Sequence, residues 1–163
     1  MVSRMASALF NTGRDGFLIG TFAWTSMTPF AVLYDILTGG AGAPALTTQY
    51  LGSVTGVNAD GTQGSSTNLC KDDATPANNR IGSPVSQSAQ GIADGADVAM
   101  AVVATHAACA GIIIAREIGG SQGTPANDDL IVWLDTATGL PVTPNGGAIT
   151  IAWANSGNYI FKL

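Results

Sequence analysis

The chain has 163 residues, of which only 10% are charged, and its formal net charge is −5. A typical soluble domain carries roughly a quarter charged residues, so this chain is unusually poor in charge. Its six Lys and Arg residues cannot build the basic face that binding to phosphates or anionic lipids requires. This excludes an electrostatic nucleic-acid binder and argues against a membrane partner. With one His and two Cys, the composition favours binding or assembly over catalysis.

The length suits a single domain that covers residues 1–163. Residues 1–18 are expected to form an N-terminal arm with a short helix, which Gly13 and Gly16 weaken. The apolar stretch from Met5 to Phe10 is too short for a secretion signal.

Two segments near the N-terminus, 19–25 and 30–36, are rich in aromatic and β-branched residues and predict a hairpin. Residues 49–57 form a weaker strand candidate. Residues 58–79 contain scarcely a large apolar side chain and are expected to form an unusually long loop. Residues 38–45, rich in Gly, Ala and Pro, predict a shorter one.

The central part of the chain contains an eighteen-residue segment without formal charge, at 98–115. Its β-branched clusters favour two buried strands joined by an Ala/His segment, with a buried helix and a membrane span as the alternatives. Residues 81–88 are a weak strand candidate, 119–128 a long loop, and 130–134 a strand followed by a turn.

The final segment has the clearest pattern. Ile149, Ile151 and Trp153 alternate with small residues, Tyr159, Phe161 and Leu163 alternate with Ile160 and Lys162, and residues 155–158 between them favour a turn. This predicts a C-terminal hairpin. The strand candidates together predict an all-β fold, an antiparallel sandwich or barrel with a short N-terminal helix and long loops. The core or interface candidates are Trp24, Trp133, Ile149, Ile151, Trp153, Phe161 and Leu163.

The soft metal ligands are Cys70, His106 and Cys109. The spacing from His106 to Cys109 resembles a fragment of a zinc site, but structural zinc normally takes four protein ligands and the chain has no second Cys pair. A loop Cys70, a buried Cys109 and an ordinary His are therefore favoured. A disulfide between the two Cys is an alternative in an oxidising compartment or after lysis.

Two pairs of adjacent carboxylates occur, Asp72 with Asp73 and Asp128 with Asp129. Their polar surroundings favour solvated loop acids, with Ca²⁺ ligation as the main alternative. Sequence adjacency does not indicate the cleft that a pair of catalytic carboxylates needs. The sequence therefore assigns no catalytic, cofactor-binding or metal-ligating residue, and we expect the protein to fold without a metal.

Both ends of the chain resemble a family of small virion-associated proteins of tailed bacteriophages. The resemblance covers roughly residues 6–35 and 128–163. Its opening part is Asn-Thr-Gly-Arg-Asp-Gly-Phe-Leu at 11–18, with Gly20, Trp24 and residues 32–35. The closing part is closer: Asp-Thr-Ala-Thr-Gly-Leu-Pro-Val-Thr-Pro-Asn-Gly-Gly at 135–147, then Ile149, Ile151, Trp153 and residues 160–163. The loop-rich segments 58–79 and 119–128 depart from it.

The resemblance implies a non-enzymatic structural protein of the virion, made in the cytoplasm of the bacterial host. Low charge and abundant small residues suit close packing of many copies, because buried charges cost desolvation energy. The leading interpretation is a capsid decoration or cement protein, whose partners are the major capsid protein and copies of itself. The alternatives are a tail or fibre-associated protein and, because of the three Trp residues, a carbohydrate-binding module.

Overall fold

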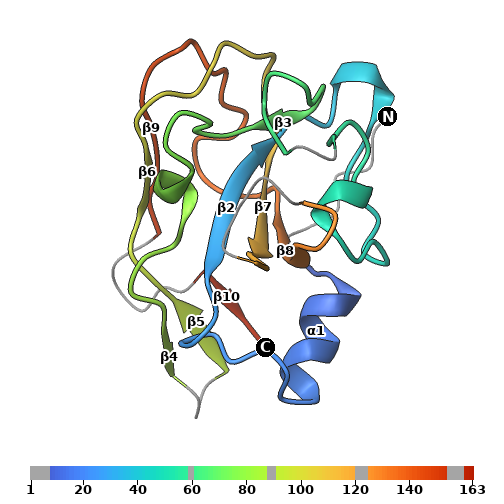
Figure 1. Ribbon diagram of the computed structural model, residues 1–163, viewed down its shortest axis with the longest axis vertical. Helices are drawn as coiled ribbons and strands as arrows, with labels where there is room; N and C mark the ends of the chain where they lie inside the picture. The colour runs from blue at the N-terminus through green and yellow to red at the C-terminus, as the bar shows by residue number, and fades with distance from the viewer. Residues whose placement is uncertain (1–7, 59–60, 88–90, 120–124, 154–159) are drawn as a thin grey trace.

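The computed structural model describes the whole chain except residues 1–7, 59–60, 88–90, 120–124 and 154–159 (Figure 1). Its strands form three antiparallel sheets. One α-helix and three short 3₁₀ helices accompany the strands. The strands are β1 (Ala8–Leu9), β2 (Pro29–Tyr34), β3 (Leu69–Cys70), β4 (Val85–Gln87), β5 (Ile92–Asp94), β6 (Val98–Met100), β7 (Gly111–Arg116), β8 (Asp129–Leu134), β9 (Ile149–Ile151) and β10 (Phe161–Lys162). The helices are α1 (Asn11–Leu18), η1 (Thr38–Gly40), η2 (Leu51–Ser53) and η3 (Pro76–Asn79). The predicted all-β class with a short N-terminal helix is confirmed.

The largest sheet has five strands in the order β1-β8-β7-β2-β3. Every residue of β2 and β8 is buried, and so are the first five of β7. Successive side chains of a strand point to opposite faces, so such uniform burial requires cover on both faces of the sheet. This explains why these strands are continuous apolar runs.

Two separate hydrophobic clusters lie on the two faces of this sheet. On one face, Ala31 and Leu33 of β2 belong to a cluster that includes residues of β6, β9 and β10. These strands come from the smaller sheets, β6-β9 and β10-β5-β4. On the other face, Val32 and Tyr34 join the residues that cover the sheet from the N-terminus and from η2. The arrangement is sandwich-like.

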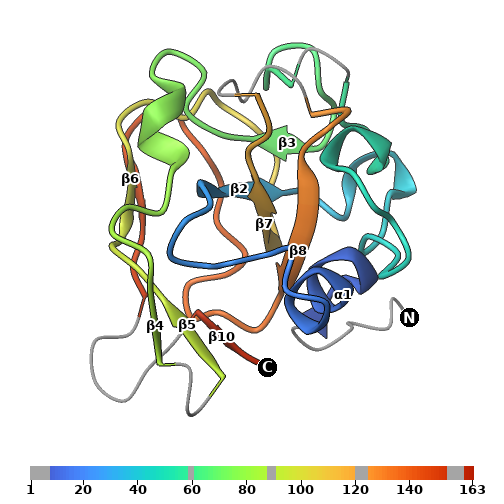
Figure 2. The ribbon, with the colours of Figure 1, turned by 60° about the horizontal axis from the view of Figure 1, so that its bottom comes forward.

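Helix α1 packs against β8 through a glycine (Figure 2). A Cβ atom at Gly13 would lie 2.5 Å from the carbonyl oxygen of Ile131. A similar close approach occurs at Gly111, where a Cβ would collide with the ring of Trp133. Gly13 weakens helix propensity but permits this contact, because any side chain there would push the helix away from the sheet.

The predicted strand at 19–25 is wrong, and with it the N-terminal hairpin. Residues 19–28 form turns, because their backbone groups bond locally: Phe22 N–H donates to Gly16 O and Met27 N–H to Ala23 O. Phe22 and Trp24 nevertheless point into the core. Phe22 and Trp24 alternate with the smaller residues Thr21, Ala23 and Thr25, as in a strand, but no described strand pairs with this segment.

The predicted strand at 49–57 is also largely wrong. Its centre is the 3₁₀ helix η2, and Leu51, Val54 and Val57 point inward. Val54 N–H donates to Leu51 O, and Val57 N–H to Val54 O. A spacing of three residues places side chains on one side of a 3₁₀ turn, which accounts for the pattern.

The predicted C-terminal hairpin does not form. Its two strands exist, but β9 pairs with β6 and β10 pairs with β5. The predicted turn at 155–158 lies outside the described residues. An alternating sequence predicts a strand but does not predict which strand pairs with it. In β6, the buried Val98 and Met100 also alternate with an exposed residue, and β6 is the strand that pairs with β9.

The charge-free segment 98–115 contains two strands, β6 and β7, as predicted. The weak candidate at 81–88 contains β4, whereas β5 was not predicted. No helix in the described ranges is long and apolar enough to cross a membrane. The expected loop at 58–79 contains β3 and η3, and several of its polar residues are buried.

Candidate functional site

Cys70, His106 and Cys109 meet near the end of the central sheet where β2 ends and β7 begins. Figure 1 shows this end of the sheet beside β3. Their nearest ligand atoms, two Sγ atoms and one ring nitrogen, all lie within 4.8 Å of one another. Cys70 is fixed by β3, where it pairs with Leu33 of β2. Cys109 is fixed by a bridge to Val142, with hydrogen bonds in both directions. Both thiols are free and buried.

This grouping corrects the expectation of a loop Cys70. The polar residues around Cys70 predict a loop, but the strand pairing of β3 draws the thiol into the core. The short spacing from His106 to Cys109 indicated only part of the site. The third member is 36 positions earlier than His106, a separation that only the fold brings together.

The imidazole of His106 is held by main-chain oxygens and a carboxylate. Nε2 lies 2.9 Å from the carbonyl oxygen of Thr67. Nδ1 lies 3.3 Å from the carbonyl oxygen of Ala107, the same oxygen that accepts a weak hydrogen bond from Cys109 Sγ at 3.7 Å. Oδ2 of the buried Asp35 is 3.8 Å from Nδ1. The ring is thus oriented with Nδ1 toward the cysteine side.

The electrostatic surroundings of this cluster are negative. The hydrogen bond that Cys70 makes to Cys109, then burial, then the charge of Asp35 raise the pKa of the Cys70 thiol well above its ordinary value. Burial acts to raise the pKa of Asp35, but hydrogen bonds from Thr38 and Leu37 and the nearby His106 outweigh it and lower that pKa. The Cys70 thiol is therefore neutral beside an ionised carboxylate.

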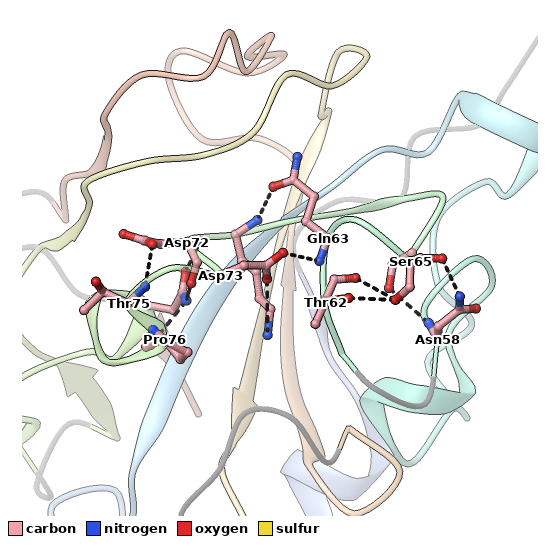
Figure 3. A network of polar contacts seen from close by, with 11 residues as sticks. Asn58, Thr62, Gln63, Ser65, Asp72, Asp73, Thr75 and Pro76 are labelled. Atoms are coloured by element: carbon pink, nitrogen blue, oxygen red, sulfur yellow. Dashed lines mark hydrogen bonds and ion pairs between the residues drawn. The ribbon is translucent and has the colours of Figure 1, made fainter.

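A second polar centre is the carboxylate of Asp72, which organises the segment 61–79 (Figure 3). It accepts hydrogen bonds from the backbone of Thr75 at 2.9 Å, from Asn78 Nδ2 at 2.8 Å and from the backbone of Ala101 at 2.9 Å. Burial acts to raise the pKa of Asp72, but these bonds prevail and lower it. Asp72 is fully buried, so the expectation of a solvated acid is wrong for this residue.

The neighbours of Asp72 continue this network (Figure 3). The side chain of Gln63 accepts a bond from the backbone of Lys71 and donates to Ala104 O. The backbone of Gln63 donates to Asp73 Oδ2 at 2.7 Å. Asp73 itself is exposed, as predicted. These contacts attach the polar segment to the rest of the fold and leave its groups partnered, so the network is structural.

The other pair of carboxylates, Asp128 and Asp129, is buried as well, which corrects the expectation of solvated acids. Asp128 Oδ1 accepts a bond from Ile118 N–H at 2.9 Å, but Oδ2 has no hydrogen-bond partner among the described residues. Burial, followed by the charges of Glu117 and Asp129, raises the pKa of Asp128 to about 6 despite the Ile118 bond.

All three Trp residues are buried, so they do not form an exposed platform for sugar stacking. Trp24 Nε1 donates to Asp94 O at 2.6 Å and Trp153 Nε1 to Ala96 O at 3.1 Å. Of the other core candidates, Ile151 and Phe161 are buried and Ile149 is partly buried. Leu163 is not a core residue, because it follows the last residue of β10 and is 57% exposed.

A cavity of about 700 Å³ lies between the central sheet and the C-terminal strands. Residues 136–140 form part of its wall, together with side chains such as Ile112, Trp153 and Phe161. Lys162 is the only ionisable residue among those that line it. The cavity therefore suits apolar contact and offers no pair of groups for acid–base catalysis.

No known protein family, curated protein or solved structure matches this chain.

Proposed function

We propose that this chain is a non-enzymatic structural protein of a bacteriophage particle. In this proposal it decorates the capsid, binding across neighbouring major-capsid subunits and stabilising their lattice. The resemblance of the closing segment 135–163 to virion-associated proteins supports the proposal. So does the low charge content, because a surface with few charges loses little hydration energy when it is covered.

The observation that carries the proposal is an apolar end of the molecule. Leu18 and Ile19, at and after the end of α1, are 77% and 73% exposed, and Leu163, at the C-terminus, is 57% exposed. Val85 of β4 is 52% exposed. Helix α1, the C-terminus and β4 lie at the same end of the fold (Figures 1 and 2). We call these four residues the apolar end.

Exposed large apolar side chains at one end of a molecule are a candidate protein interaction surface. An array of many copies on a lattice can hold each copy with a small interface, because repeated contacts raise the overall strength of attachment. The apolar end, of four side chains, is suited to such repeated, individually weak contacts.

The first test is the copy number of the protein in purified particles of the phage that encodes it, measured by quantitative mass spectrometry. A copy number comparable to that of the major capsid protein is expected. A few copies per particle would indicate the tail-associated alternative, and absence from particles would contradict a virion role.

The second test uses undecorated capsids and a co-sedimentation assay. The double substitution Leu18→Ser with Ile19→Ser should abolish binding without unfolding the protein. Leu37→Ser is the matched control, because Leu37 is 60% exposed but precedes η1 and belongs to none of the elements that form the apolar end. Equal binding by both variants would show that the apolar end is not the docking surface.

A further inference from the structure

We infer that Cys70, His106 and Cys109 form a binding site for a zinc-like divalent cation, with one coordination position left to solvent. This site is independent of the proposed capsid role. The three ligands come from β3 and from the segment before β7, so a bound ion would tie these two parts together.

The donor set matches the chemistry of zinc. Two thiolates and one imidazole form a set that zinc uses with water or another ligand in its fourth position. Tetrahedral zinc with ordinary bond lengths separates two sulfur ligands by about 3.8 Å. The ligand atoms here lie within 4.8 Å of one another before any ion is bound, so small side-chain rotations would close the site.

The histidine is already positioned for this role. A ligating imidazole must present a lone pair on one nitrogen and usually donates the other N–H to a carbonyl or carboxylate. Nε2, at 2.9 Å from Thr67 O, is placed to donate. In this tautomer the lone pair is on Nδ1, so Nδ1 makes no hydrogen bond to Ala107 O, and the Cys109 thiol donates to that oxygen instead. We therefore assign Nδ1 as the ligand atom.

The charge balance also favours a cation. Binding transfers the two S–H protons to solvent and forms two Zn–S bonds and one Zn–N bond, with no change of oxidation state. The ion and the two thiolates together are neutral. Asp35, 3.8 Å from Nδ1, adds negative potential beside the site but is not one of the three clustered ligands. We assign it as a nearby charge that favours a cation and not as a ligand.

The sequence alone does not favour a zinc site, because it offers no fourth protein ligand. A three-ligand site answers that objection, since the fourth position is then filled by water. Solvent reaches the site from the side of His106, because the His106 side chain is 13% exposed while both thiols are buried.

The test is a titration of the full chain, reduced and stripped of metal, with Zn²⁺ and with Co²⁺. One equivalent of Co²⁺ should bind and produce a thiolate-to-cobalt charge-transfer band together with the visible bands of tetrahedral cobalt, and Zn²⁺ should abolish both. Cys70→Ser, Cys109→Ser and His106→Asn should each lose the tetrahedral spectrum. Asp35→Asn should keep the spectrum but bind Co²⁺ more weakly, because the negative charge beside the site is lost.

Asp15→Asn is the control, because it removes an exposed carboxylate on α1 and should bind like the wild type. The wild-type titration keeps the test decisive even if a cysteine variant fails to fold. Binding without the thiolate band would overturn the proposal. So would protein isolated under non-reducing conditions that is metal-free and lighter by two hydrogens, because the cysteines would then form a disulfide.

Discussion

The central strands and the polar segment 61–79 are both buried, but different forces bury them. Strands β2 and β8 are covered on both faces by apolar side chains. The polar segment contains six buried polar residues, Gln63, Ser66, Asn68, Lys71, Asp72 and Asn79. Its burial depends on hydrogen bonds that replace those lost to water. Hydrophobic pattern therefore reports only one of the two ways in which this chain builds its interior.

The largest effect is expected in the apolar region. Trp133 is fully buried, contacts the backbone at Gly111 and packs edge-on against Tyr34. Trp133→Ala should lower the free energy of unfolding by about 3–5 kcal/mol, because it leaves a cavity that the sheet cannot close. Urea denaturation measures this. A loss below 1 kcal/mol would mean that the central sheet is not the main source of stability.

The polar region should respond to a single carboxylate. Asp72→Ala removes the acceptor of the Thr75 and Ala101 backbone N–H groups and should cost about 2–4 kcal/mol. The pKa of Asp72 is lowered in the fold, so its stabilisation is present above pH 4 and is lost as the pH falls further. The difference between wild type and variant, followed by urea denaturation, should shrink below about pH 4.

Asp15→Ala is the control for this measurement, because Asp15 is exposed on α1. If Asp72→Ala destabilised the protein no more than Asp15→Ala, the polar segment would not depend on its hydrogen bonds, and the contrast between the two regions would fail.

The sequence predicts the apolar region well and the polar one poorly. The runs at 30–36, 112–115 and 130–134 predict β2, β7 and β8 because burial on both faces needs continuous apolar residues. The C-terminal alternation predicts β9 and β10 as strands, but it cannot name their partners. Partner choice depends on which distant strand presents a complementary face, and β6 and β5 provide that only once the chain is folded.

The polar segment and the cysteine cluster could not be predicted for a related reason. The acceptor for the Ala101 backbone N–H is 29 positions away, at Asp72. Cys70 lies within a polar stretch, and only its pairing with Leu33 brings it near Cys109. Hydrogen bonds between distant positions have no periodicity in a single sequence, so they leave no pattern to read.

A smaller effect on stability is expected at Asp128, the buried residue immediately before β8. Its pKa of about 6 lies above the ordinary 3.8, so the folded state favours the protonated form. Its contribution to stability is full below about pH 4 and is lost as the pH rises through 6. Asp128→Asn should therefore stabilise the protein at pH 8 by about 1–3 kcal/mol and change little at pH 4.

Urea denaturation at the two pH values measures this dependence. The backbone bond from Ile118 can be kept by the Asn carbonyl, while the new amide group reduces the gain because Oδ2 had no partner. A variant that was destabilised equally at both values would indicate that Asp128 is held as an ion, by contacts stronger than burial.

The smallest effect on stability is expected at Leu163, which separates folding from binding. Leu163 is 57% exposed, and its backbone N–H donates to Gly91 O at 2.8 Å, a bond that any side chain allows. Leu163→Ser should change the free energy of unfolding by less than about 0.5 kcal/mol. The same variant should bind capsids more weakly if the apolar end is the docking surface. Phe161→Ser, two residues earlier and buried, should instead destabilise the fold. Urea denaturation and capsid co-sedimentation of these two variants separate a role in the core from a role in binding. A loss of stability in Leu163→Ser would make Leu163 a core residue. Unchanged capsid binding by Leu163→Ser would remove Leu163 from the docking surface.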